Sequence, residues 1–336
     1  MVSRIVAMES YLPENIVNNS DLSSIVETSD EWINSRTGIS ERRISVGENT
    51  SDLATRVAKQ LMNKANVLPE DIGLIIIATM SPDYLTPSVG CIVQGNIKAI
   101  NALAFDINAA CSGFVYGLSL AEKFMQTGLY KNALVIGAEV LSKIVNWKDR
   151  GTCVLFGDGA GGVLIRREDL EEDLIIAEDI NSNGASWKSL RGGKVPLRNP
   201  FVGELDSEDG LEVCNKDDDL EYYLKMNGLE IFNFATRIVP KSIEKILDNS
   251  GENIDNIKYI VPHQANSRII DIVAKKLKLD REKFYLNLDK YGNTSSASIP
   301  IALAEMKAKN LLEQGDKIII VGFGAGLTWA SMIINI

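Results

Sequence analysis

The sequence predicts an α/β protein with a mostly parallel sheet, because apolar strand-like runs alternate with amphipathic helical stretches. The clearest helical stretches are residues 52–65 and 228–247. The composition, 45% hydrophobic and 24% charged, is ordinary for a globular protein. The strand-like runs are residues 72–80, 102–107, 133–137, 259–261 and 317–321.

Two helix starts are marked by capping residues. Ser29 is followed by two acidic residues, and the helix that it caps should end near Gly38. Residues 50–52, Thr-Ser-Asp, predict a second helix start of the same kind.

A weak internal repeat relates the two halves of the chain. Cys111 begins a helical stretch that leads to a strand ending at Gly137, and Ser296 begins one that leads to a strand ending at Gly322. The two spans are equal, which indicates a duplicated unit. Coincidence is the alternative, since α/β proteins often repeat such patterns.

The stretch 181–219 is rich in glycine and proline and predicts a long excursion between the halves. It ends in three consecutive aspartates, residues 217–219. A solvated surface is the simplest interpretation of these acids, and a functional role is the alternative.

Composition excludes several classes of protein. The chain has 336 residues, a net charge of −10 and a pI near 4.9, which argues against nucleic acid as the main partner. The first residues lack the apolar core of a signal peptide, and no apolar run reaches about 18 residues, so no membrane span is expected. The four cysteines have neither metal-like nor framework spacing, which favours a reduced, cytoplasmic setting and no bound metal.

Cys111 is the strongest candidate nucleophile. It lies where an apolar strand runs into a helix, and we expect the helix N–H groups to favour the thiolate and lower the thiol pKa. The alternative is a small core residue, which most lone cysteines are. His263 is the only histidine, so any mechanism that needs two imidazoles is excluded.

Three further segments strengthen the case for Cys111. His263 follows a strand, where α/β sites gather, and Asn293 lies in a tight turn before a helix. Residues 322–326 form a glycine-rich turn whose backbone N–H groups can approach a carbonyl oxygen. Each has a structural alternative: a core histidine, a turn residue and a plain hairpin. Together they offer a thiol, two neutral side-chain donors and an oxyanion site.

These segments resemble the β-ketoacyl-[acyl-carrier-protein] synthase III family, in the family's order and over nearly the whole chain. The segments that carry the resemblance are residues 28–38, 108–114, 149–151, 156–161, 261–266, 291–295 and 322–329. The resemblance implies the thiolase fold, with duplicated βαβαβαββ halves in an α/β/α/β/α arrangement, and a homodimer. We place the first half at 1–176, with Cys111, and the second at 177–336, with His263, Asn293 and the 181–219 excursion.

The resemblance also implies a reaction that starts fatty acid synthesis. Cys111 takes an acyl group from acyl-coenzyme A, which is a substrate and not a permanently bound cofactor. Malonyl-acyl carrier protein then loses carbon dioxide, and the resulting enolate attacks the acyl thioester. The His263 Nε2–H and the Asn293 amide would stabilise the enolate oxygen. The backbone N–H groups of Cys111 and Ala325 would stabilise the oxyanion of the tetrahedral intermediate at Cys111. The family usually has glycine at the position of Ala325.

Further positions match the family's binding residues. The coenzyme A positions are Trp32, Arg36, Arg150 and Asn266, where an indole and a guanidinium can sandwich an adenine. The carrier-protein positions are Gln264, Arg268, Lys275 and Lys276, a basic cluster on an acidic protein. Thr86 matches the position that closes the acyl pocket from the other subunit, often as phenylalanine. A core aromatic and an ordinary solvated helix face are the alternatives for Trp32 and the lysines.

The sequence is compatible with more than one function. A Cys-His-His elongating enzyme is excluded by the single histidine, and a thiolase by the lack of cysteine in residues 322–326. A papain-like hydrolase would need different residues around its cysteine. A non-catalytic dimer partner usually lacks the cysteine. A Cys-His-Asn thioester hydrolase, or a relative that primes a polyketide or quinolone pathway, stays possible, and the acyl donor is undetermined.

Overall fold

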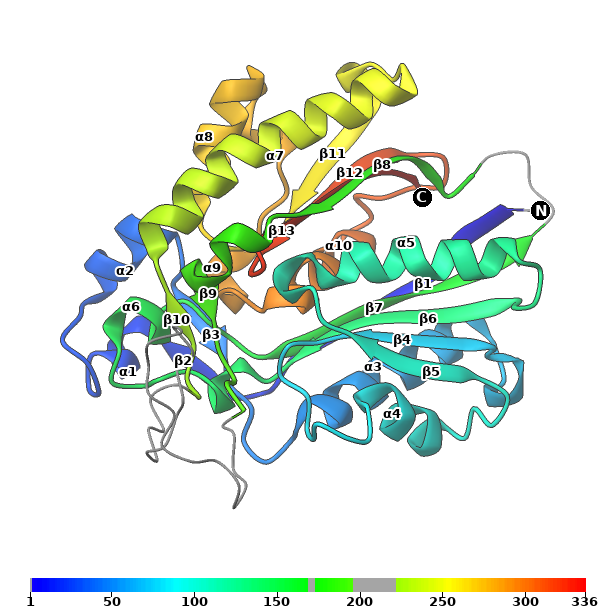
Figure 1. The fold of residues 1–336 in the computed structure, drawn as a ribbon, viewed down its shortest axis with the longest axis horizontal. Helices are drawn as coiled ribbons and strands as arrows, with labels where there is room; N and C mark the ends of the chain where they lie inside the picture. The colour runs from blue at the N-terminus through cyan, green and yellow to red at the C-terminus, as the bar shows by residue number, and fades with distance from the viewer. Residues whose placement is uncertain (1, 169–172, 196–221) are drawn as a thin grey trace, which may run out of the picture.

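The first sheet belongs to the N-terminal half. The structure, a computed structural model, describes residues 2–168, 173–195 and 222–336 (Figure 1). Within these residues the sheet has the strand order β1-β7-β6-β4-β5. β7 is antiparallel to both of its neighbours, and β4 is parallel to β5 and β6. The strands are β1 (Val2–Tyr11), β4 (Leu74–Ala78), β5 (Leu103–Ile107), β6 (Asn132–Glu139) and β7 (Gly159–Glu168).

The second sheet repeats this order. Among the described residues its order is β11-β12-β13-β8, and β13 is antiparallel to both of its neighbours. A single bridge between Ile260 and Phe284 takes the place that β5 has in the first sheet. The predicted duplication is therefore confirmed. The strands are β8 (Ile175–Ser182), β11 (Ile257–Pro262), β12 (Lys317–Gly324) and β13 (Thr328–Asn335).

Helices cover both sheets and separate them, which gives the predicted α/β/α/β/α layers (Figure 1). α5 and α10 lie between the sheets, and their buried apolar side chains share one core with strands of both. α3 and α4 cover the outer face of the first sheet, and α7 and α8 cover that of the second. In the described part of the chain, no helix is both long and apolar enough to cross a bilayer. The six helices are α3 (Thr50–Ala65), α4 (Val89–Ile97), α5 (Gly113–Gln126), α7 (Gly228–Ser250), α8 (Ser267–Leu277) and α10 (Ser298–Ala308).

The capping residues place the N-terminal helices. The helix α2 (Asp30–Thr37) begins after Ser29, whose side chain accepts from the backbone N–H of Trp32, and ends at Gly38 with a φ of 80°, as predicted. α3 begins at Thr50, and its cap is Asn49, one residue before the predicted start. Asn49 and the third helical residue form a capping box, a pairing that the Thr-Ser-Asp pattern alone did not indicate.

Most of the smaller elements gather at one end of the two sheets (Figure 1). Part of the predicted 181–219 excursion is regular: it contains the end of β8 and a 3-10 helix, η4 (Gly184–Ser189), which Asn183 caps. Residues 196–221, with the predicted acidic run, lie outside the described residues. The remaining small elements are β2 (Ile16–Asn18), β3 (Glu41–Arg43), β9 (Leu190–Arg191), β10 (Lys225–Met226), α1 (Asn19–Leu22), α6 (Arg150–Cys153) and α9 (Leu288–Tyr291).

Cys111 and Ser296 occupy equivalent turns in the two halves. Each lies in a short 3-10 turn, η2 (Ala110–Ser112) or η9 (Ser295–Ala297), directly before a helix of the central layer. The first residue of each turn has a positive φ, 46° in η2 and 48° in η9. This is the structural origin of the repeat in the sequence.

Each turn packs against a glycine of the opposite half. A Cβ atom added to Gly137 of β6 would lie 2.3 Å from the Ser296 carbonyl oxygen. A Cβ added to Gly322 of β12 would lie 2.8 Å from the Cα of Ser112. The two halves therefore interlock at the turn that carries Cys111, and only glycine permits this contact.

We expect Gly137→Ala to destabilise the protein, because the new methyl group would meet backbone that cannot rotate away. Overpacking of this kind costs about 1–3 kcal/mol. Urea denaturation of the variant should show a lower transition midpoint. Gly95→Ala is the matched control, since nothing lies within 4 Å of a Cβ at Gly95. Equal midpoints for Gly137→Ala and the natural protein would contradict the interlocking.

Candidate active site

Cys111 lies in the short turn η2, between β5 and α5, and lines the candidate site. Its side chain is buried, with only 5% of the residue exposed. A Cβ added to Gly324 of β12 would lie 3.3 Å from the Cys111 Sγ. The second half of the chain therefore forms the wall beside the thiol.

The pKa of the Cys111 thiol differs from the prediction. It is raised to about 12, mainly by burial, and the charge of an ionised Glu139 contributes to this rise. The Ser295 hydroxyl, which is buried without a well-formed hydrogen bond elsewhere, lowers it by a smaller amount. The prediction of a lowered pKa is therefore wrong for this structure, because loss of water outweighs the nearby N–H groups. Cys111 is a neutral thiol here.

His263 directly follows β11 and is almost completely buried. Its backbone N–H donates to the Val321 carbonyl oxygen (2.7 Å), and its ring packs edge-on against Phe323 of β12. Nδ1 lies 2.7 Å from the Ser298 Oγ, a hydroxyl that can also donate to the Ser295 carbonyl oxygen (2.8 Å). Nε2 is the other ring nitrogen. Burial lowers the pKa of His263 to about 3, so the imidazole is neutral.

Asn293 is fixed by its backbone on both sides. Its N–H donates to the Leu155 carbonyl oxygen (2.8 Å), and its carbonyl oxygen accepts from the Gly157 N–H (3.0 Å). The side-chain Oδ1 accepts from the Ser295 N–H (2.9 Å). The Nδ2 group is thereby left as the donor that Asn293 can offer to a ligand.

One cavity joins these three side chains. It has a volume of about 120 Å³, and Cys111, His263 and Asn293 all line it, together with Gly324. The sequence predicted this set correctly as neighbours. It did not predict the apolar walls, because single leucines, methionines and phenylalanines outside a motif carry no local signal. These walls are Leu155, Phe156, Leu190, Met226, Ile231, Phe232, Ile269 and Phe323.

The glycine-rich segment 322–326 begins in β12, where Gly324 lies beside Cys111, and continues into the turn after that strand. The residue of this turn with a positive φ is Gly326 (133°) and not Ala325. A side chain at position 325 is therefore compatible with the turn. The Ala325 carbonyl oxygen accepts from the Thr328 Oγ1 (2.9 Å), which holds the turn in place.

Trp32, Arg36 and Arg150 form one cluster. The guanidinium carbons of Arg36 and Arg150 lie 4.5 and 4.7 Å from the centre of the Trp32 ring. Arg150 also donates to the Glu27 carbonyl oxygen (2.9 Å). Asn266 lines the active-site cavity and donates to the Arg36 carbonyl oxygen (2.9 Å), so it connects this cluster to the site.

The predicted docking residues divide into two groups. Arg268, Lys275 and Lys276 are exposed on α8. Gln264 is 1% exposed, and its side chain bonds the carbonyl oxygens of Pro262 and Tyr285 and the backbone N–H of Asn287. Its assignment as a docking residue is therefore wrong, because a buried side chain cannot touch a docked protein.

Thr86 is exposed and does not line the cavity that contains Cys111. Among the other cysteines, Cys91 is exposed and Cys153 is buried, while Cys214 lies outside the described residues. In the described ranges, no cluster of three or more His, Cys, Asp or Glu side chains could hold a metal ion.

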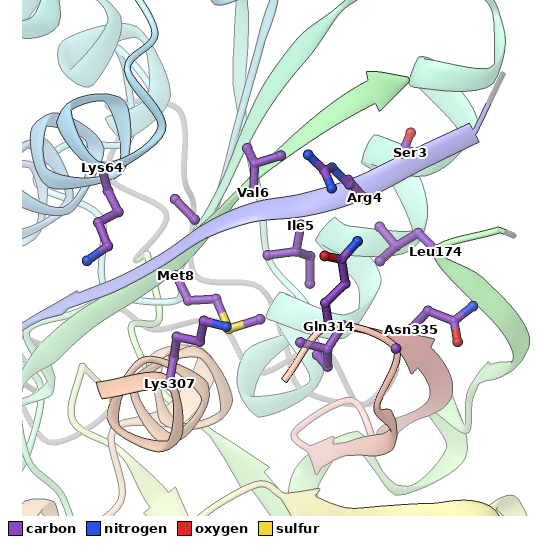
Figure 2. A pocket seen from close by; sticks show the side chains of 13 residues that line it. Ser3, Arg4, Ile5, Val6, Met8, Lys64, Leu174, Lys307, Gln314 and Asn335 are labelled. Carbon is purple, nitrogen blue, oxygen red and sulfur yellow. The ribbon is translucent and has the colours of Figure 1, made fainter. Parts of the chain in front are cut away.

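A larger hollow of about 540 Å³, which none of the three catalytic side chains lines, runs along the edge strand β1 (Figure 2). Ile5 and Met8 of β1 line it, and Lys64 and Lys307 approach from helices on either side of the strand. It contains no cysteine, histidine or carboxylate side chain. The smaller cavity is therefore the catalytic candidate.

A duplicated thiolase fold with a buried Cys-His-Asn set defines a condensing enzyme. Residues 105–184 match the family description 3-oxoacyl-[acyl-carrier-protein] synthase III, and residues 247–336 match its C-terminal part. The chain belongs to this family, the β-ketoacyl-[acyl-carrier-protein] synthases III, and is an acyltransferase-type condensing enzyme.

Individual relatives agree with this membership. The chain is 53% identical over 331 residues to a β-ketoacyl-[acyl-carrier-protein] synthase III of Clostridium acetobutylicum, with 98% of each chain covered. It is 52% identical over 325 residues to one of Clostridium novyi, covering 97% of this chain and 96% of the relative. The crystal structure of 3-oxoacyl-[acyl-carrier-protein] synthase III from Aquifex aeolicus has a TM-score of 0.89 and 41% identity, covering 99% of this chain and all of the other.

Proposed function

We propose that this enzyme condenses an acyl-coenzyme A primer with malonyl-acyl carrier protein, with loss of carbon dioxide, to start fatty acid synthesis. The observation that carries the proposal is that Cys111, His263 and Asn293 line one buried cavity beside the Gly324 backbone. Such a cavity can hold a thioester away from water.

In the first half-reaction, the Cys111 sulfur attacks the acyl thioester and coenzyme A leaves as its thiol. The backbone N–H groups of Cys111 and Ala325 serve as the oxyanion donors. Coenzyme A binds across the Trp32 cluster, whose two guanidinium groups are suited to an adenine ring and to phosphates.

In the second half-reaction, loss of carbon dioxide from the malonyl thioester generates the carbanion, so no strong base is required. Negative charge develops on the thioester oxygen, and His263 Nε2–H and Asn293 Nδ2–H donate to it. For Nε2 to carry the imidazole proton, the single Ser298 hydroxyl proton must go to Nδ1 and not to the Ser295 carbonyl oxygen, which lies 2.8 Å from the same hydroxyl. The enolate carbon then attacks the acyl group on Cys111 and releases the sulfur.

The partners follow from surface charge. Arg268, Lys275 and Lys276 are exposed cations on a protein of net charge −10, and they suit an acidic carrier protein.

We also propose that the two halves of the chain divide after residue 176. This position lies near the start of β8, which belongs to the second sheet.

A homodimer is supported by apolar exposure near the other edge of the first sheet. β5 is the edge strand, with Leu103 42% exposed, and Tyr84 and Leu85 are 63% and 80% exposed. Thr86 follows these two residues. In a dimer through this edge, Thr86 would reach the partner's acyl pocket.

Because Thr86 is smaller than phenylalanine, we expect acyl groups longer or more branched than acetyl to be accepted. Each additional buried methylene contributes only about 0.8 kcal/mol, so the preference should be modest. Values of kcat/KM for acetyl-, isobutyryl- and hexanoyl-coenzyme A check this in the natural enzyme and in Thr86→Phe, which should shift the preference toward acetyl. Confinement of the natural enzyme to acetyl-coenzyme A, or an unchanged preference in Thr86→Phe, would contradict it. Leu85→Ala tests whether the neighbouring side chain refills the space.

The overall activity is tested by incubating the enzyme with acyl-coenzyme A and malonyl-acyl carrier protein. Carbon dioxide and a β-ketoacyl thioester should appear in equal amounts. Free acid without a ketone product would identify a thioester hydrolase instead.

The fold also occurs in a priming β-ketosynthase of the R1128 polyketide pathway. Its crystal structure is 28% identical in sequence, has a TM-score of 0.89, and is matched over all of this chain and 96% of that one. Transfer to a different acyl acceptor would favour such a specialised role.

A further inference from the structure

A buried carboxyl group, Glu139, lies at the contact between the two halves. It is the last residue of β6 and is fully buried. Its Oε2 accepts from three groups at the end of β4: the Thr79 hydroxyl (3.1 Å), the Met80 N–H (3.1 Å) and the Ser81 hydroxyl (2.6 Å). The close partner of Oε1 is Ser296 of the second half, at 2.8 Å.

The hydrogen bonds of Ser296 indicate where the proton lies. Its Oγ is 2.8 Å from the Glu139 Oε1 and 2.7 Å from the Ala78 carbonyl oxygen. A carbonyl oxygen can only accept, and a serine has one proton to donate. If Ser296 donates to Ala78, the Glu139 Oε1 must be the donor to Ser296. If Glu139 were ionised, the single Ser296 proton could serve only one of these two contacts, and the oxygens of the other contact would face each other without a proton.

We propose that Glu139 is a neutral carboxylic acid that donates to Ser296 and so positions the turn that carries the catalytic amide. The chain runs from Glu139 Oε1–H to Ser296 Oγ–H to the Ala78 carbonyl oxygen, and it crosses from one half to the other. Asn293 is three residues before Ser296, and its Oδ1 accepts from the backbone N–H of Ser295, the residue directly before Ser296. Glu139 thus acts through Ser296 as a positioning residue.

The electrostatic surroundings of Glu139 also favour its neutral form. Burial raises the pKa of Glu139, and no cation bonds it among the described residues. Two other titratable groups face it. The first is Lys143, whose ammonium group donates to Asn49, Thr50 and the Pro82 carbonyl oxygen and not to Glu139. The second is Cys111, whose thiol would be harder to ionise if Glu139 carried a negative charge. A neutral acid keeps negative charge away from the nucleophile while retaining a donor for Ser296. The assignment does not depend on which thioester the site takes.

Infrared difference spectroscopy at neutral pH tests the proposal directly. The natural protein should show the C=O stretch of a protonated carboxyl group that is lost in Glu139→Gln. Glu122→Gln is the matched control, because Glu122 is another buried carboxyl with a raised pKa, on α5. That variant should keep the Glu139 band. Absence of any band specific to Glu139 would overturn the proposal.

The pH profile of Cys111 alkylation gives a second readout, because it reports whether the side chain at position 139 carries a charge. Glu139→Gln keeps a donor toward Ser296 and an acceptor toward residues 79–81, so the pH profile of Cys111 alkylation should coincide with that of the natural enzyme. A profile displaced to lower pH would show that an ionised carboxylate had been removed. Condensation should fall by at least tenfold in Glu139→Ala and be restored to within threefold in Glu139→Gln.

Ser296→Ala keeps the proposal testable if Glu139→Gln does not fold. It removes the acceptor of the Glu139 O–H, so the carboxyl band should move to higher frequency. An unchanged band in Ser296→Ala would overturn the proposed hydrogen bond.

Discussion

Cys111→Ala should form no acyl-enzyme with any acyl-coenzyme A, because this thiol is the cysteine of the Cys-His-Asn cavity. Intact-protein mass spectrometry measures the result as the absence of an acyl adduct. The loss should be complete, since no other group in the cavity can hold the acyl chain as a thioester.

Cys91→Ala and Cys153→Ala are the matched controls, since neither cysteine lines the cavity. Both should acylate at the rate of the natural enzyme, and Cys214→Ala should do the same. A Cys111→Ala protein that gains the adduct at full rate would show that the nucleophile has been misassigned.

His263→Ala and Asn293→Ala should each lose decarboxylation of malonyl-acyl carrier protein by roughly 10²–10³-fold, the usual consequence of removing one oxyanion donor. Acylation of Cys111 should be less affected. Burial raises the pKa of the thiol and lowers that of the imidazole, so both are neutral and no preformed thiolate–imidazolium pair is lost.

Single-turnover rates separate the two half-reactions. Acylation is followed by the mass of the protein, and decarboxylation by labelled carbon dioxide. Asn293→Asp is a useful companion, because it keeps the size of the side chain and the acceptor for the Ser295 N–H but removes the Nδ2 donor. Equal losses in both half-reactions of His263→Ala would identify the imidazole as the base for the thiol instead.

The layered fold was predictable from the sequence because its signals are local. Apolar runs gave the central strands, and Ser29 and Gly38 bounded α2 correctly. The equal spacing of Cys111 and Ser296 from their strand glycines reflects a physical constraint. Each turn approaches a backbone from the other half at a distance that only glycine allows.

The properties that depend on burial were not predictable. The strand-to-helix position of Cys111 indicated a lowered pKa, but the second half covers the thiol and removes the water that a thiolate needs. Gln264 looked like a surface residue beside His263, yet its amide bonds the backbone within the core. The role of Glu139 depends on Ser296, which is 157 residues away in the sequence.

The central claim is that Cys111 carries the acyl group and gives it to the malonyl unit. A chase experiment tests this most directly: the enzyme is acylated with labelled acyl-coenzyme A, freed of excess reagent, and mixed with malonyl-acyl carrier protein. The account predicts that the adduct on Cys111 disappears as one equivalent of labelled β-ketoacyl-acyl carrier protein forms. An adduct that persists while product forms, or one that is released as free acid, would contradict it.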